Sequence, residues 1–134
     1  MNSGQLARLC GISTDTLRHY ERVGVLPKAP RTRSGYRQYP AEAQVRVMAI
    51  RRALALGFSL AELARIFRVR ERGGAPCREV RRLAQDKLAE LDRRLADLTA
   101  LRDDLRTLLA DWDRRLETTP EGTQARLLER LGKI

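Results

Sequence analysis

Apolar positions near the start of the chain recur at helical spacing in two short segments. Leu6 and Leu9 share one face of a helix that Ser3 can cap, and Gly11 ends this segment. Ser13 can cap a second helix that follows at once. Two short helices around a Gly-containing turn predict a helix-turn-helix.

The second of these helices has an unusually polar outer face. Ile12 and Leu17 are expected to face inward. The residues left for the outside are Thr14, Thr16, Arg18 and Tyr20. Arginine suits guanine edges and phosphates, and hydroxyls suit the DNA backbone, so this face indicates a recognition helix for the major groove. His19, the only histidine, is expected at the surface or facing phosphate.

The segment "VLPKAPRTRSGYRQYP" changes the pattern from helical spacing to alternation between prolines and a Ser-Gly turn. We interpret it as a β-hairpin wing, with Tyr36, Arg37 and Tyr39 alternating on its second strand. Arg31, Arg33 and Arg37 on such a hairpin would reach phosphates beside the groove.

Two further helices complete the first half of the chain. Pro40 opens a helix that runs to about Gly57, and Ser59 with Glu62 forms a capping box for the next. The positions expected on their buried sides are Val45, Met48, Ala49 and Leu56 in one, and Leu60, Leu63 and Phe67 in the other. The "RGGAP" stretch then closes a domain predicted at residues 1–72.

Residues 76–117 predict one long helix, because no Gly or Pro interrupts the chain from Cys77 to Glu117. Its apolar residues step by four and three, as in a coiled coil, with one extra three-residue step after Leu98. This seam comprises Ala84, Leu88, Leu91, Leu95, Leu98, Leu101, Leu105, Leu108 and Trp112. A lone helix would leave the seam in water, so we expect an antiparallel homodimer with Trp112 as a core anchor. The tail, residues 118–134, either packs Leu127, Leu128 and Leu131 on the seam as a short helix or frays.

Charge is distributed unevenly along the chain. The formal net charge is +10, from 27 Lys and Arg against 17 Asp and Glu. Residues 1–70 hold 13 basic and 4 acidic side chains, so nearly all the excess lies in the first half. A nucleic-acid partner explains this better than a solubilising surface or a membrane-surface patch. No apolar run approaches a membrane span, so a cytoplasmic protein that does not bind membranes is expected.

The candidate chemistry narrows the function class further. The chain has no Gly-rich phosphate loop, no histidine pairable with a nucleophile and no plausible carboxylate pair, which argues against an enzyme. Cys10 and Cys77 are too few for a disulfide framework and are expected as free thiols, with Cys10 in the core. A coiled-coil architectural protein that binds DNA without regulating a promoter remains an alternative.

Four blocks in register resemble the MerR family of bacterial transcription regulators: "GISTDTLRHYERVGVLP", "RSGYRQY", "LGFSLAELARIF" and "CREVRRLAQDKLAELDRRLADL". The resemblance implies a mainly α fold, in which a winged helix-turn-helix DNA-binding domain with a second helix pair precedes a long antiparallel dimerisation helix. It places the DNA contacts on Thr14, Thr16, Arg18 and Tyr20, and the wing contacts on Gly35, Tyr36 and Arg37. It also implies a palindromic promoter site, whose overlong spacer is distorted so that RNA polymerase can engage both promoter elements.

The block at Cys77 resembles the heavy-metal branch of the family, in which this cysteine supplies one ligand. The second ligand position falls on Trp112, and the tail holds neither Cys nor His. Soft metals need at least two thiolates or imidazoles, so we expect no metal cofactor unless Asp111, Asp113 or an external thiol completes the site. The other hypotheses are redox or electrophile sensing by Cys77, whose helix N-terminus and neighbour Arg78 favour the thiolate, an organic ligand near Trp112, or no small effector.

Overall fold

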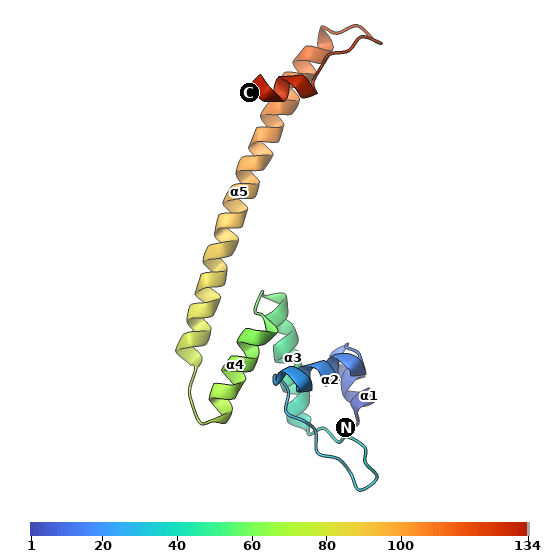
Figure 1. Ribbon diagram of the computed structural model, residues 1–134, viewed down its shortest axis with the longest axis vertical. Helices are drawn as coiled ribbons and strands as arrows, with labels where there is room; N and C mark the ends of the chain where they lie inside the picture. The colour runs from blue at the N-terminus through green and yellow to red at the C-terminus, as the bar shows by residue number, and fades with distance from the viewer. Residues whose placement is uncertain (134) are drawn as a thin grey trace. The chain divides into compact units, whose positions relative to one another are not determined.

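The computed structural model describes residues 1–133 and is mainly α-helical, as predicted (Figure 1). Its elements are α1 (Ser3–Cys10), α2 (Thr14–Val23), α3 (Ala41–Ala55), α4 (Leu60–Glu71), α5 (Cys77–Glu117) and the 3₁₀ helix η1 (Leu128–Lys133). The chain forms two compact units, Met1–Lys87 and Leu88–Ile134. Within residues 1–133, no helix is both long and apolar enough to cross a bilayer.

Short polar side chains begin the first two helices, and glycines end them. Asn2, rather than Ser3, caps α1: its side chain accepts the Gln5 N–H at 2.8 Å, and the Gln5 side chain accepts the Asn2 N–H at 3.0 Å. Ser13 caps α2, as the sequence predicts. Gly11 ends α1 at φ 67°, a left-handed conformation in which a side chain would be strained.

The core of the first unit lies where α1, α2, α3 and α4 meet (Figure 1). α1 packs against α2 and α3, and α2 also contacts α4. The residues that become fully buried there are Leu6, Cys10, Leu17, Val25, Leu26, Val47 and Ile50. This core holds α2 with its polar face outward.

The prediction of which α3 residues face the core is wrong. Val45, Met48 and Leu56 keep 73%, 47% and 53% of their surface exposed, and Ala49 is also exposed. The buried residues are Ala43, Val47 and Ile50. Apolar residues surround this helix almost completely, so their spacing alone could not select the face that packs.

The helix α4 begins as predicted, at a capping box. The Ser59 Oγ accepts the Glu62 N–H at 3.0 Å, and a Glu62 carboxylate oxygen accepts the Ser59 N–H at 2.8 Å. Lys87, in the first turns of α5, donates to the same carboxylate at 2.8 Å. The Lys87 hydrogen bond is the main reason that the Glu62 pKa is lowered.

The segment predicted as a two-stranded wing is a turn in which one antiparallel bridge joins Arg31 to Arg37. No strand forms within residues 1–133. Pro30 has no N–H, so between Pro30 and Gln38 only the Gln38 N–H donates, to the Pro30 carbonyl at 2.8 Å, and the ladder does not extend. We call residues 31–37 the wing turn.

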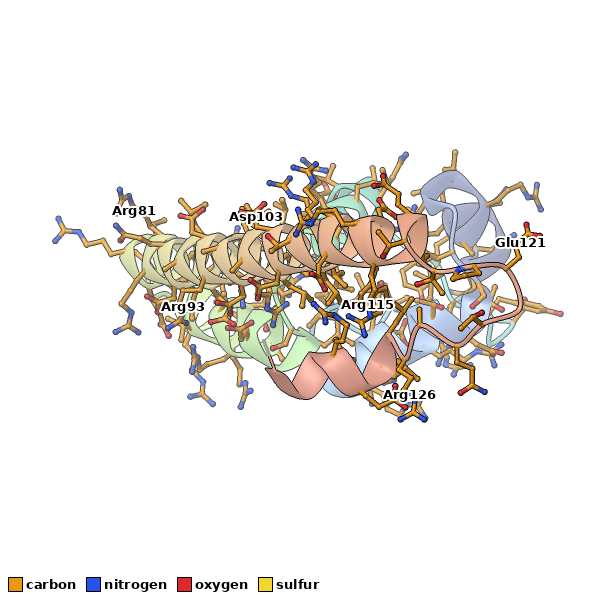
Figure 2. All side chains as sticks on the ribbon, turned by 90° about the horizontal axis from the view of Figure 1, so that it is seen from above. Arg81, Arg93, Asp103, Arg115, Glu121 and Arg126 are labelled. Carbon is orange, nitrogen blue, oxygen red and sulfur yellow. The ribbon has the colours of Figure 1, made fainter. Side chains whose placement is uncertain are left out.

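The second unit contains most of α5 and the segment that returns along it. Arg130 of η1 donates two hydrogen bonds of 3.1 Å to the Asp111 carboxylate, and this contact lowers the Asp111 pKa. Figure 1 shows η1 against the end of α5, and Figure 2 shows Arg115 between α5 and the returning chain, where it donates to the Ala125 carbonyl at 2.9 Å. The predicted packing of the tail is correct for Leu131, which lines a groove with Leu101, Leu105 and Leu108. It is wrong for Leu128, which is 72% exposed. The last residue of the predicted tail, Ile134, lies outside the described residues.

Candidate nucleic-acid interface

The exposed face of α2 carries polar side chains that contact residues three positions away on the same helix or at its cap. The Ser13 Oγ accepts the Thr16 N–H at 3.1 Å and lies 2.9 Å from the Thr16 hydroxyl. One turn later, Arg18 pairs with Asp15 at 3.2 Å, and both side chains are largely exposed. A surface ion pair of this kind is weak, so a phosphate or a guanine edge can replace Asp15 as the partner of Arg18.

Tyr20 does not belong to this exposed face, contrary to the prediction. It is buried with Leu17 on the inner side of α2, and burial raises the pKa of its hydroxyl. The step from Leu17 to Tyr20 is the i, i+3 spacing of one helix face, so the tyrosine follows the leucine into the core. Of the predicted contact residues only Arg18 is exposed, with Thr14 and Thr16 half-buried beside it. The other exposed polar residues of α2 are Asp15, His19 and Arg22.

The wing turn presents side chains beside α2 within the same unit. Gly35 adopts φ 84°, and its N–H donates to the Thr32 carbonyl at 2.9 Å. Arg31 donates to the Gly35 carbonyl at 2.9 Å, which stiffens the turn. Tyr36 and Arg33 are exposed, and Arg33 makes no ion pair or side-chain hydrogen bond with residues 1–133.

Glu21 is a residue of this region that sequence reasoning missed. It is the one charged side chain buried within the part of the chain that the structure describes. Its carboxylate accepts a hydrogen bond from the Tyr39 hydroxyl and pairs with Arg37 at 3.5 Å. A signal was present in the sequence, since Glu21 lies four residues after Leu17 and so falls on the buried face of α2.

The two cysteines differ as predicted. Cys10 is buried, and burial raises the pKa of its thiol against the opposing effect of Arg51. Cys77 is exposed at the start of α5. Among residues 1–133 no three His, Cys, Asp or Glu side chains cluster in a way that could hold a metal ion.

Cys77 also lies on the lining of an apolar groove of about 790 Å³ in the first unit. The groove lies between α3, α4 and the start of α5, and Phe58 and Val80 contribute to its walls. A reagent with an apolar part could therefore bind beside the thiol.

The predicted coiled-coil seam is exposed on α5. Its leucines Leu88, Leu91, Leu95, Leu98, Leu101 and Leu105 keep between 51% and 62% of their surface exposed. Trp112 is half-buried, and its indole N–H has no hydrogen-bond partner within residues 1–133. An exposed apolar stripe of this length is typical of a helix that pairs with another.

Comparison with known families identifies the class. The profile described as "MerR family regulatory protein" matches residues 2–39, and the profile described as "MerR, DNA binding" matches residues 44–108. The chain therefore belongs to the MerR family and is a DNA-binding transcription regulator, not an enzyme.

Particular relatives place the chain near the heavy-metal branch of the family. The mercuric resistance operon regulatory protein of Bacillus cereus is 37% identical over 71% of this chain and 72% of its own length. The lead(II) complex of the transcription regulator PbrR691 from Ralstonia metallidurans CH34 has a TM-score of 0.72 and 26% identity, over 96% of this chain and 98% of that one. HiNmlR, a MerR family regulator solved bound to promoter DNA, shares the fold with a TM-score of 0.59 and 23% identity, over 87% of this chain and 93% of that one.

Proposed function

We propose that the chain binds a palindromic promoter site as a homodimer, with α2 in the major groove and the wing turn on the flanking phosphates. The observation that carries this proposal is the exposed polar face of α2, with Arg18 held only by a surface ion pair. The excess positive charge of residues 1–70 supports it, since phosphate contacts supply most of the affinity for DNA. By family resemblance, the bound dimer distorts the spacer so that RNA polymerase engages the promoter in the cytoplasm.

Selection of binding sites from a random duplex library tests this proposal. Recovery of one palindrome supports it, and so does weaker binding of that palindrome by Arg18→Ala. Arg102→Ala is the matched control, because Arg102 is an exposed arginine of α5 that the proposal places away from DNA. Recovery of unrelated sequences would instead support an architectural DNA-binding protein.

The effector is proposed to act on Cys77. The thiol is exposed, lies at a helix N-terminus and lines the apolar groove, so electrophiles with an apolar part can reach and modify it. Mass spectrometry after treatment with such an electrophile should find the adduct on Cys77 and none on buried Cys10. DNA binding or promoter activity should change in the wild type and stay unchanged in Cys77→Ser.

A metal effector is the second candidate, because relatives of this chain are named for mercury and lead. The chain offers a single exposed thiol for such an ion, so Asp111, Asp113 or an external thiol would have to complete the site. Stoichiometric mercury held against a competing small thiol, and released in Cys77→Ser, would favour this candidate over the electrophile.

A further inference from the structure

The buried carboxylate of Glu21 joins two parts of the candidate DNA interface. Its side chain is 4% exposed, although the residue belongs to the helix whose outer face is proposed to read DNA. The Tyr39 hydroxyl donates to one carboxylate oxygen, and the Arg37 guanidinium lies 3.5 Å from the other. A buried charge is costly unless such partners satisfy it.

Both partners come from the segment that carries the wing turn. Arg37 is one of the two residues in the bridge that closes this turn. Tyr39 follows two residues later and is itself buried, with its backbone N–H donating to the Met1 carbonyl at 2.6 Å. Burial, together with Glu21, raises the pKa of Tyr39 to about 12, so the hydroxyl keeps the proton that it donates.

The wing arginines therefore have different surroundings. The Arg37 side chain is half-buried against Glu21, and the Arg31 side chain donates a hydrogen bond to the Gly35 carbonyl inside the turn. Arg33 is exposed and makes no ion pair or side-chain hydrogen bond with residues 1–133. If Arg37 moved to a phosphate, the buried carboxylate would be left without its only cationic partner among those residues.

We propose that Glu21 is a positioning residue for DNA binding: through Arg37 and Tyr39 it holds the wing turn against α2, so that Arg33 and Tyr36 reach the flanking phosphates. Arg37 then acts mainly through Glu21 and not as a phosphate contact.

This inference rests on the proposed function. It predicts that removing the negative charge of Glu21 weakens binding to DNA, which is the opposite of what charge alone predicts. Removing a carboxylate near polyanionic DNA should strengthen binding if charge alone mattered, because repulsion falls and Arg37 becomes free for a phosphate. Removing a positioning carboxylate should weaken binding, because the wing turn is no longer held in the geometry that binds DNA.

Glu21→Gln is the variant that separates the two outcomes, and Glu42→Gln is its matched control. Glu42 is an exposed carboxylate of the same unit, in the first turn of α3, and makes no ion pair with residues 1–133. The probe is a duplex carrying the palindrome that the wild type selects from a random library. We expect Glu21→Gln to weaken binding roughly tenfold and Glu42→Gln to leave it unchanged or slightly tighter.

A footprint of the variant on this duplex shows which part of the DNA it still protects. In Glu21→Gln, protection of the phosphates at the edges of the site should disappear while protection in the central grooves remains. The log–log dependence of affinity on salt should become shallower by about 0.9 for each phosphate that the variant no longer neutralises. A fold that is merely loosened would protect the whole site less.

Tyr39→Phe keeps the test valid if Glu21→Gln folds poorly, and a double variant tests whether Glu21 and Arg37 act together. Tyr39→Phe removes one hydroxyl from Glu21 and should weaken edge protection in the same way. Glu21→Gln combined with Arg37→Gln should weaken binding by less than the product of the single effects, because both residues act on one geometry. Circular dichroism of each variant shows whether it is folded.

The outcomes that overturn the inference differ from those that overturn the proposed function. Glu21→Gln binding as tightly as the control, or single effects that simply multiply, would overturn the positioning role. Failure of the wild type to select any duplex would overturn the proposed function instead. In that case, hydrogen exchange of residues 30–38 still tests the link: it should accelerate in Glu21→Gln and not in Glu42→Gln.

Discussion

Replacing Leu95 with glutamate should convert the proposed dimer into a monomer. Leu95 lies in the middle of the seam and is 61% exposed in the single chain. Burying its remaining surface in a partner contributes about 1 kcal/mol, which is roughly half of the 1.5–3 kcal/mol for a fully buried leucine. The same holds for the five other exposed seam leucines, Leu88, Leu91, Leu98, Leu101 and Leu105.

Two protomers together would therefore gain on the order of 12 kcal/mol from these leucines. Association itself costs about 4–15 kcal/mol, so the margin that holds the dimer together is small. Leu95→Glu removes about 1 kcal/mol of burial from each protomer, and two glutamates facing the seam add a desolvation cost of several kcal/mol. A total loss above roughly 3 kcal/mol weakens the dimer by more than about 100-fold.

The assay is sedimentation velocity at micromolar concentration, with circular dichroism to confirm that α5 stays helical. Ala96→Glu is the matched control, since it places the same charge one residue away, on the exposed side of the heptad. The wild type and Ala96→Glu should sediment as dimers and Leu95→Glu as a monomer. A monomeric wild type, or equal behaviour of the two variants, would refute the role assigned to the seam.

Three further predictions follow from individual contacts. Arg18→Ala should weaken binding of the selected palindrome by roughly 1–3 kcal/mol without changing the oligomeric state, and a gel-shift titration at wild-type affinity would contradict the recognition role. Glu62→Gln should lower the free energy of unfolding at pH 7 by about 1 kcal/mol, because the amide can still accept the Ser59 N–H but has no negative charge for Lys87 or for the positive end of α4. The Glu62 pKa is lowered in the fold, so this stabilisation is present above the ordinary glutamate pKa of 4.5 and disappears as the pH falls through the lowered pKa. Urea unfolding at pH values below the lowered pKa should therefore give the same free energy of unfolding for the variant and the wild type. Competition with a small thiol should show that mercury binds the protein no more tightly than it binds an isolated thiol, because Cys77 is the one exposed thiol of the chain; retention of the ion would contradict this.

Local features of the chain could be predicted from the residues alone. Ser13, Ser59 and Glu62 cap helices where the sequence places them, because a short side chain satisfies the free N–H groups of a first turn through contacts only three residues away. The long helix begins at Cys77 and ends at Glu117 as expected, since no Gly or Pro interrupts it. The family, too, could be inferred from four short blocks in register.

Contacts between distant residues could not be predicted in this way. Helical spacing says which residues of α3 share a face, but only packing against α1 decides that Val47 and Ile50 are buried while Val45 and Met48 stay exposed. The burial of Tyr20 and the link from Glu21 to Tyr39 have the same origin. Tyr39 lies 18 residues from Glu21 along the chain, and the two meet because the core folds the segment before α3 back onto α2. Propensity, capping and periodicity depend on residues a few positions apart, so they can be predicted from the sequence. The choice of buried face depends on all the neighbouring elements at once, so only the tertiary structure decides it.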